Sequence, residues 1–279
     1  MTKGRQLYFF DGTGNRHGIN LFDGIVDWWP VESMEQEWSY MRKEIGIIMA
    51  AGLGTRMRPL TLKIPKPLVK VFGTPLIETV IGGLKSRDIS EIYIVVGYLK
   101  EQFSYLCEKY QGIHLLENPD YSVKNNISSI YAARDVLGAA NCFICEADLL
   151  VSDLSVFDKK LDCSGYYGKM VRGFSDDWVF EQQNGLITRV GKGGTDTFNM
   201  VGISYFTKED SRILANEIVR AYHTEGSADL FWDEVVNQNL DKLHLKVFPV
   251  EEGQIVEIDT VEELVELDNN ALAANAVSQ

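Results

Sequence analysis

A segment of small residues and two cationic side chains are the part of this chain best suited to chemistry. The apolar run 45–49 ends in residues 50–56 (AAGLGTR), and small residues at such a turn let backbone N–H groups approach an anion closely. The cations are Arg56 and Lys66, and Lys66 is flanked by two prolines that restrict the backbone. Small residues and fixed positive charge after a predicted strand indicate a site for a nucleoside triphosphate.

Two better-known phosphate loops do not fit this segment. The pattern Gly-x4-Gly-Lys-Ser/Thr does not occur in the sequence. The dinucleotide fingerprint requires a third glycine where the chain has Met57, and Pro59 would interrupt the helix that should follow. The segment therefore predicts a different class of nucleotide site.

Carboxylates at two predicted strand ends could hold a metal ion. Asp148 follows the apolar run 142–147, so it would lie at the same carboxyl edge of the sheet as the small-residue segment. A second apolar strand carries Glu257 and Asp259, which alternation places on one face. Mg²⁺ bridges carboxylate and phosphate oxygens. We therefore expect Asp148 and Asp259 to bind Mg²⁺, with a turn or helix-cap role as the alternative for each.

These groups predict direct transfer without a covalent enzyme intermediate. An acceptor phosphate oxygen would attack the α-phosphorus of the triphosphate in line, and pyrophosphate would leave, so catalysis would consist of positioning and charge neutralisation. Lys66 would offset the charge on the reacting phosphates, and Arg56 would hold the pyrophosphate. The four histidines are scattered along the chain, and none is paired with a Ser or Cys nucleophile.

Two clusters of acidic residues and tryptophan suggest the kind of acceptor. Trp178 directly follows Asp176 and Asp177, and Trp232 lies three positions after Asp229. Aromatic faces with negative charge nearby recognise a quaternary ammonium group. The alternative is that these tryptophans, Trp232 above all, are core residues.

The predicted elements that position these residues alternate between strand and helix from residue 45 onward. This alternation predicts an α/β fold with a Rossmann-like, mostly parallel or mixed sheet flanked by helices. Recurrent glycines from 165 to 194 indicate a small antiparallel subregion that binds the acceptor. We expect strands at 45–49, 92–96, 113–116 and 142–147, and helices at 74–87, 100–110, 126–137, 208–222, 230–238 and 261–272. Asn125 and Asn126 would cap the helix at 126–137.

Composition limits the possible partners. The chain has 279 residues, 45% of them hydrophobic, and a formal net charge of −13, which argues against a nucleic-acid or anionic-membrane surface. No apolar run is long enough to insert into a membrane, and no signal peptide is recognisable, so we expect a cytoplasmic protein. Cys142 and Cys145 would point to opposite faces of one strand and could not share a metal.

Two domains are expected. Residues 44–279 would form the catalytic domain, which is long enough to bury a substantial core. Residues 1–43 form an N-terminal extension of unknown role. The extension is rich in tryptophan, which makes a self-contact, and hence a homodimer, plausible.

Several motifs resemble those of a known family. Residues 50–61 (AAGLGTRMRPLT) followed by 65–68 (PKPL) resemble the sugar-phosphate and choline-phosphate nucleotidyltransferases. The runs 96–103, 125–131, 231–233 and 257–259 are similar to those of the bacterial CTP:phosphocholine cytidylyltransferases. The likeness extends from residue 46 to about residue 267. The chain departs from the family at Glu146, where the family usually has aspartate.

The resemblance implies a fold of the nucleotidyltransferase type that uses CTP, Mg²⁺ and a small cationic phosphate or phosphonate ester as acceptor. It implies that the nucleotide contacts Ala51, Gly52, Gly54, Thr55, Gly97, Tyr98 and Asn126. It implies that the cation of the acceptor lies among Trp178, Asp229, Trp232 and Glu257. Arg56 and Lys66 would be the catalytic residues, and Asp148 and Asp259 the metal ligands.

The leading hypothesis is therefore Mg²⁺-dependent transfer of CMP from CTP to phosphocholine, giving CDP-choline and pyrophosphate. An alternative is cytidylyl transfer to 2-aminoethylphosphonate or phosphoethanolamine, whose primary ammonium needs carboxylates more than aromatic faces. A sugar-1-phosphate nucleotidyltransferase is a more distant alternative, because we find no sugar-binding set of residues. A catalytically silent nucleotide-binding regulator would typically lack the metal carboxylate or the phosphate lysine, but Asp148 and Lys66 are both present.

Overall fold

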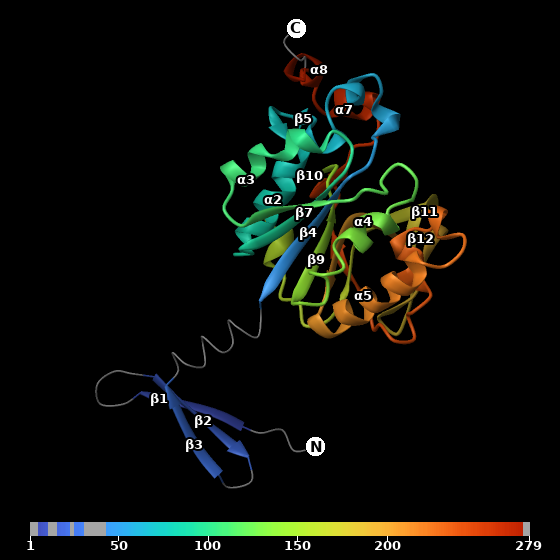
Figure 1. Cartoon of the computed structure of the whole chain (residues 1–279). Helices are drawn as coiled ribbons and strands as arrows, with labels where there is room; N and C mark the ends of the chain where they lie inside the picture. The colour runs from blue at the N-terminus through green and yellow to red at the C-terminus, as the bar shows by residue number, and fades with distance from the viewer. Residues whose placement is uncertain (1–4, 11–15, 23–24, 31–42, 276–279) are drawn as a thin grey trace. The chain divides into compact units, whose positions relative to one another are not determined.

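The computed structural model describes residues 5–10, 16–22, 25–30 and 43–275. The chain divides into two compact units, residues 1–43 and 44–279. The first unit contains a three-stranded antiparallel sheet in the order β1-β2-β3, which can be followed in Figure 1. Its strands are β1 (Arg5–Phe10), β2 (Arg16–Phe22) and β3 (Ile25–Pro30). The sequence had not predicted these strands.

A seven-stranded sheet organises the second unit, with the strand order β13-β11-β12-β9-β4-β7-β8. β4 pairs in parallel with β7 and β9, β7 with β8, and β11 with β13, whereas β12 is antiparallel to β9 and β11. The predicted α/β fold with a mostly parallel sheet is confirmed. The strands are β4 (Glu44–Ala50), β7 (Glu91–Val96), β8 (Ile113–Glu117), β9 (Asn141–Glu146), β11 (Gly165–Gln183), β12 (Leu186–Phe206) and β13 (Lys246–Val250).

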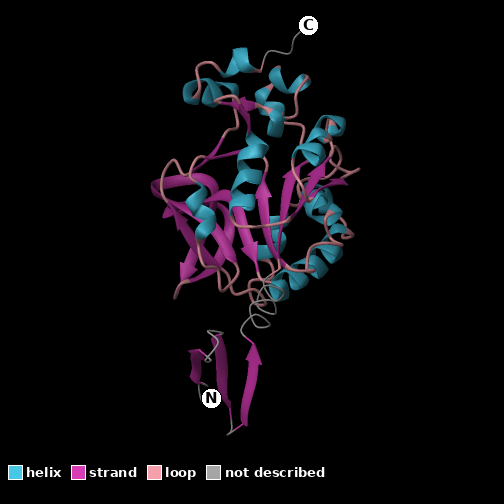
Figure 2. Ribbon diagram, turned by 90° about the vertical axis from the view of Figure 1, so that its left-hand side faces the viewer, coloured by secondary structure: helices cyan, strands magenta, loops and turns pink. Residues whose placement is uncertain are grey.

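Helices cover both faces of this sheet (Figures 1 and 2). One face packs against α2 (Leu76–Ser86) and α3 (Tyr105–Lys109). The other packs against α4 (Ile127–Ala132), α5 (Lys208–Tyr222) and α6 (Trp232–Asn237). Cys145 belongs to the first core and Cys142 to the second, so the two thiols face opposite sides as predicted. Burying apolar side chains on both faces of a parallel sheet is the main source of its stability.

Several predicted helices are shorter in the structure. The predicted helix 100–110 is a 3₁₀ turn, η4 (Lys100–Phe103), followed by α3. The predicted helix 126–137 ends at Ala132 and continues as turns. Asn126 makes no side-chain cap for α4, because its side-chain oxygen accepts a hydrogen bond from the Trp232 N–H at 3.0 Å. The prediction that the Asn126 side chain caps this helix was therefore wrong.

A short antiparallel ladder brings the C-terminal segment to the edge of the sheet. It joins β10 (Leu149–Val151) to β14 (Ile255–Glu257), with Leu149 opposite Glu257. The Ile258 N–H also donates to the Asp148 carbonyl at 3.3 Å. Behind the ladder, α7 (Val261–Leu267) begins with a capping box in which Thr260 and Glu263 bond each other's backbone N–H groups. Glu257 and Asp259 are thereby held beside Asp148.

The remaining elements are short. They are β5 (Lys70–Val71), β6 (Thr74–Pro75), α8 (Ala271–Ala274), and the 3₁₀ turns η1 (Thr55–Met57), η2 (Leu60–Leu62), η3 (Lys66–Leu68), η5 (Leu154–Asp158) and η6 (Ser227–Asp229). No helix in the described residues is long and apolar enough to cross a lipid bilayer.

Candidate active site

Three adjoining cavities lie at the carboxyl edge of the parallel strands, and Arg56 lines all of them. The amide cavity, about 290 Å³, is lined by Met49, Ala51, Gly52, Arg56, Asn118, Tyr121, Lys124, Asn125, Asn126, Ser128, Ser129, Glu146, Asp148 and Glu257. The lysine cavity, about 250 Å³, is lined by Met49, Ala50, Gly52, Gly54, Thr55, Arg56, Lys66, Pro67, Ala147, Asp148 and Asp259. The acidic cavity, about 550 Å³, is lined by Arg56, Glu146, Asp176, Asp177, Trp178, Lys192, Met200, Gly202, Phe231, Glu257 and Asp259. Because they share residues, we treat them as one cleft.

The small-residue segment after β4 forms the wall between the amide and lysine cavities. A side chain at Gly52 would meet no protein atom within 4 Å, so the backbone there is open to a ligand. Gly54 has a φ of +58°, and a Cβ on it would lie 2.8 Å from the Lys66 Cβ. Glycine is therefore needed at position 54 both for the backbone conformation and for the approach of Lys66. Thr61 fixes the turn by donating its hydroxyl to the Gly54 carbonyl at 2.7 Å.

Lys66 joins two carboxylates from distant segments. Its Nζ donates to Asp148 Oδ2 at 2.7 Å and to Asp259 Oδ1 at 2.6 Å, and the side chain is only 8% exposed. Burial alone would lower the pKa of Lys66, but the interactions with Asp148 and Asp259 outweigh it, and the pKa is raised. Arg56 pairs with the other oxygen of Asp259 at 2.5 Å. The lysine cavity thus holds two fixed cations at its wall.

Three carboxylates at the centre of the cleft could hold a metal ion. Oxygen atoms of Glu146, Asp148 and Glu257 all lie within 4.8 Å of one another. Enclosure in the cleft, together with Glu257 and Asp148, raises the pKa of Glu146 well above its usual range. Enclosure, together with Asp148 and Asp259, raises the pKa of Glu257 to about 8. A divalent cation would relieve this crowding of like charges and would find the oxygen ligands it prefers.

The structure differs from the sequence-based prediction in how it groups the acidic residues. Asp148 lies in the carboxylate cluster as expected, but Asp259 is engaged by Lys66 and Arg56. Glu146, which was not predicted as a site residue, takes a place in the cluster. Two-residue alternation on β9 puts Glu146 and Asp148 on one face, and that signal could have identified it.

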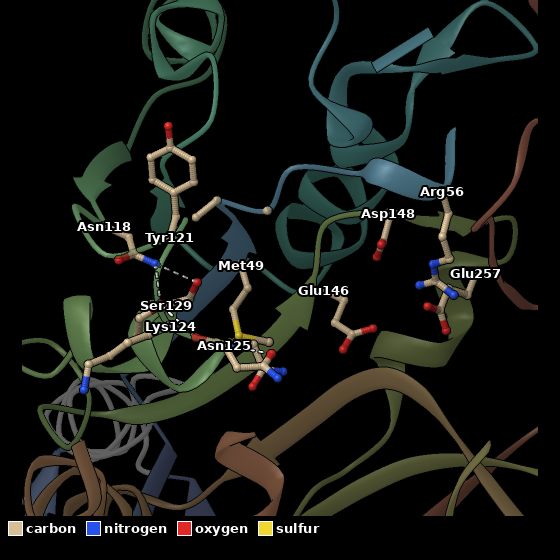
Figure 3. A pocket seen from close by; sticks show the side chains of 14 residues that line it. Met49, Arg56, Asn118, Tyr121, Lys124, Asn125, Ser129, Glu146, Asp148 and Glu257 are labelled. Carbon is tan, nitrogen blue, oxygen red and sulfur yellow. Dashed lines mark hydrogen bonds between the residues drawn. The ribbon is translucent and has the colours of Figure 1, made fainter. Parts of the chain in front are cut away.

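The far end of the amide cavity carries mainly neutral polar groups, together with Lys124 (Figure 3). Figure 3 shows Asn118, Tyr121 and Ser129 at this end, away from Glu146 and Asp148. The Asn118 side-chain amide donates to Ser129 Oγ at 3.2 Å and to the hydroxyl of the neighbouring serine at 2.9 Å. Among the residues at this end, the sequence predicted only Asn126. Asn118 could have been recognised because it follows β8 at the same carboxyl edge.

Gly97 and Tyr98 lie behind the small-residue segment and line none of the three cavities. A Cβ on Gly97 would lie 2.7 Å from the Tyr121 ring, so glycine leaves room for that ring. The Tyr98 N–H donates to the Ala51 carbonyl at 3.1 Å, and its hydroxyl donates to the Thr61 carbonyl at 3.0 Å. These two residues therefore support the small-residue segment and the Tyr121 ring.

The acidic cavity combines two aromatic rings with several carboxylates. Trp178 and Phe231 form an edge-to-face pair with ring centroids 5.4 Å apart. The Lys192 ammonium lies 5.9 Å from the centroid of Trp178 and 5.3 Å from that of Phe231. Asp176 and Asp177 complete the wall contributed by β11, and Glu257 faces the cavity from β14. Trp178 and Glu257 therefore lie together as the sequence predicted.

Trp232 and Asp229, in contrast, do not line this cavity. Trp232 is 3% exposed and packs in the core with Tyr166 and Phe206, whose ring centroids lie 5.9 and 6.1 Å away. Asp229 is exposed on η6. Phe231, just before α6, faces the cavity, and the next position on the helix turns toward the core. The structure therefore agrees with the alternative interpretation, in which Trp232 is a core residue.

A parallel sheet edge with this small-residue segment, a buried lysine and a carboxylate cluster defines a nucleotidyltransferase. The comparisons with known proteins agree. Residues 46–170 match the MobA-like NTP transferase domain. The chain is 52% identical over 232 residues to the 2-aminoethylphosphonate cytidylyltransferase of Lancefieldella rimae, an alignment that covers 83% of this chain and 94% of that protein.

Choline-phosphate enzymes are also similar. The choline-phosphate cytidylyltransferase of Streptococcus pneumoniae is 36% identical over 228 residues, covering 80% of this chain and 96% of that protein. The solved structure of the CTP:phosphocholine cytidylyltransferase from Streptococcus pneumoniae matches with a TM-score of 0.75 and 34% identity, covering 81% of this chain and 98% of that one. This chain belongs to the family of cytidylyltransferases with a MobA-like NTP transferase domain. It is an enzyme of the nucleotidyltransferase class.

Proposed function

We propose that this protein is a Mg²⁺-dependent enzyme that transfers CMP from CTP to 2-aminoethylphosphonate. A phosphonate oxygen attacks the α-phosphorus, the bond to the β-phosphate breaks, and pyrophosphate leaves with its electron pair. The composition of the acidic cavity is the observation that carries the choice of acceptor. The 52% identity to a 2-aminoethylphosphonate cytidylyltransferase supports the same choice.

The acidic cavity suits a primary ammonium better than a quaternary one. A primary ammonium has three N–H donors that need acceptors, and Asp176 and Asp177 offer carboxylate oxygens. A quaternary ammonium has no N–H donor and depends on aromatic faces. The cavity provides one tryptophan and one phenylalanine, since Trp232 lies in the core. Carboxylates therefore dominate recognition of the acceptor.

The triphosphate is bound by the backbone of the small-residue segment and by the two cations next to it. Ala51, Gly52, Gly54 and Thr55 line the cleft, where their backbone can approach the phosphates. Lys66 neutralises charge on the reacting phosphates, and the partly exposed Arg56 holds the departing pyrophosphate. The expected nucleotide contact at Asn126 fits its position in the amide cavity, whereas Gly97 and Tyr98 act from behind the segment.

Mg²⁺ is the metal we propose for the carboxylate cluster. Asp148, Glu146 and Glu257 would hold it, and the closeness of their oxygens is what supports this assignment. The ion would supply positive charge against the α-phosphate of CTP. Asp259, which was expected from the sequence to be a ligand, orients Lys66 and Arg56 by its two ion pairs.

Phosphocholine is a second candidate acceptor. The edge-to-face arrangement of Trp178 and Phe231, with their ring planes 62° apart, is the observation that favours it, because two ring faces can share one cation. Phosphoethanolamine shares the primary ammonium of 2-aminoethylphosphonate and differs by one bridging oxygen. The homodimer and the cytoplasmic location expected from the sequence stay predictions.

Pyrophosphate release from CTP tests this proposal directly. We would compare kcat/KM for 2-aminoethylphosphonate, phosphocholine and phosphoethanolamine, each with Mg²⁺ and with excess chelator. We expect 2-aminoethylphosphonate to exceed phosphocholine by at least about tenfold, the factor that 1.4 kcal/mol of differential binding gives. Asp177→Asn should raise KM for the two primary amines more than for phosphocholine. A preference for phosphocholine would contradict the acceptor assignment, and full activity with chelator would contradict the metal.

A further inference from the structure

Lys192 occupies an unusual place in the acidic cavity. Its ammonium lies over both rings of the aromatic pair, by which we mean Trp178 and Phe231, at 5.9 and 5.3 Å from their centroids. Within residues 43–275, Lys192 makes no salt bridge, although Asp176 and Asp177 line the same cavity. Its position therefore follows from the rings and from its own backbone.

That backbone is held by Arg189. Arg189 donates to the Lys192 carbonyl at 2.6 Å and to the Gly193 carbonyl at 3.2 Å. The ladder between β11 and β12 places Lys192 directly opposite Trp178. Cross-strand neighbours have Cβ atoms close enough for a long side chain to reach a ring. The fold thus brings the lysine to the aromatic pair.

We infer that Lys192 is a specificity-determining residue that selects against a quaternary ammonium acceptor. This inference rests on the proposed function and deepens it. A trimethylammonium group has to use the aromatic faces, so it must displace the Lys192 ammonium from them. Two cations also repel each other at such short range. A primary ammonium can bind to carboxylates such as Asp176 and Asp177 and leave Lys192 in place.

The carboxylates of the cavity attract the cations of both acceptors. The expected effect of Lys192 is therefore on the ratio of kcat/KM for phosphocholine to kcat/KM for 2-aminoethylphosphonate. Lys192→Met removes the charge and keeps much of the side-chain length. Because Lys192 is exposed, we expect the variant's kcat/KM for phosphocholine to rise about three- to fivefold through a lower KM, in line with the size of an exposed cation–π contact, and that for 2-aminoethylphosphonate to change by less than about twofold. The KM for CTP should stay the same.

Two matched variants serve as controls. Lys192→Arg keeps a cation over the rings, so its acceptor ratio should stay near that of the wild type. Lys160→Met removes an exposed lysine outside the cleft, so it should also keep the wild-type ratio. A double-variant cycle with Trp178→Leu adds a stricter criterion. If Lys192 acts through the aromatic pair, Lys192→Met should change the ratio less when Trp178 is absent, because only the Phe231 ring then remains.

Two outcomes would overturn the inference. One is an unchanged acceptor ratio in Lys192→Met. The other is an equal loss of kcat/KM for both acceptors, which would mean that Lys192 contacts the phosphonate or phosphate group they share. Failure of the proposed function is a separate result, because wild-type enzyme alone reveals it by preferring phosphocholine. The Lys192 inference concerns the change in the ratio, whichever acceptor the wild type prefers.

Discussion

The two ends of the cleft are built in different ways. The lysine cavity takes most of its wall, including the small-residue segment, Arg56 and Lys66, from one stretch, residues 49–67, and only Ala147, Asp148 and Asp259 from elsewhere. The acidic cavity takes residues from β11, from β12, from the turn before α6 and from β14. The first is thus a local structure at the edge of a parallel sheet, and the second is assembled by long-range pairing.

This difference shows which positions of each end can vary independently. In the lysine cavity, the spacing of glycine, arginine and lysine is set by adjacent turns, so a change at one position moves the others. In the acidic cavity, each wall belongs to a separate strand or helix, so one residue can change while the remaining walls keep their positions. We therefore expect differences in acceptor preference to arise from residues of the acidic cavity.

The largest effect on stability is expected from a residue that the sequence had suggested for the acceptor. Trp232→Ala should lower the free energy of unfolding by about 3–5 kcal/mol, the usual cost of removing a large buried aromatic side chain. The ring is 3% exposed and packs on Tyr166 and Phe206. Urea denaturation would measure the loss.

The matched control is Trp178→Ala, since Trp178 is only partly buried and lines the cavity. It should cost less stability and should raise the KM for phosphocholine, whose cation depends on aromatic faces. If Trp232→Ala instead left stability intact and raised that KM, the division between a core tryptophan and a cavity tryptophan would be wrong.

Four of the seven strands of the sheet could be predicted from the sequence. β4, β7, β8 and β9 are mainly apolar runs followed by turns, and their carboxyl ends meet at one edge, so the position of Asp148 followed from the topology. The ends of the helices were less predictable. Asn126 had the sequence of a cap, but a hydrogen bond to α6 took its side chain.

The acidic cavity could be predicted only in part. Trp178 and the two aspartates before it line this cavity. Near residue 230, however, Phe231 lines the cavity and the next residue, Trp232, packs in the core. That division depends on the angle at which α6 meets the sheet, which no short pattern encodes. Lys192 carries no local signal either, because its role arises from cross-strand pairing with Trp178. Glu257 was predicted as an acceptor contact, and its place beside Glu146 depends on the ladder between β10 and β14.

A substitution of Lys66 tests the lysine cavity, at the other end of the cleft. Lys66→Met removes the charge that joins Asp148 and Asp259 and should lower kcat by about 10²–10³, the effect of losing one preorganised charge contact to a transition state. The loss should be the same for every acceptor, because Lys66 does not line the acidic cavity. Lys63→Met is the matched control, since Lys63 is exposed and does not line the cavity. A loss that depended on the acceptor would mean that the two ends do not act separately.

A substitution of Asp233, a buried residue outside the cleft, gives the smallest expected effect, and this effect depends on pH. It is 2% exposed and accepts a hydrogen bond from the Tyr166 hydroxyl at 3.0 Å. Burial raises its pKa from 3.8 to about 7, and the bond from Tyr166 offsets only part of that rise. Between these values the folded state holds a proton that the unfolded state has released. The contribution of Asp233 to stability is therefore full below about pH 4 and falls as the pH rises to about 7.

Asp233→Asn should remove this pH dependence, because the amide oxygen can still accept the bond from Tyr166 and no charge has to be buried. At about pH 8 the variant should be more stable than the wild type by on the order of 1–3 kcal/mol, and near pH 4 the difference should shrink toward zero. Urea denaturation of both proteins from about pH 4 to pH 8 would measure it. Since Asp233 belongs to the core side of α6, the acceptor ratio should not change. If the acceptor ratio changed at constant pH, the buried residues of α6 would also determine the shape of the acidic cavity.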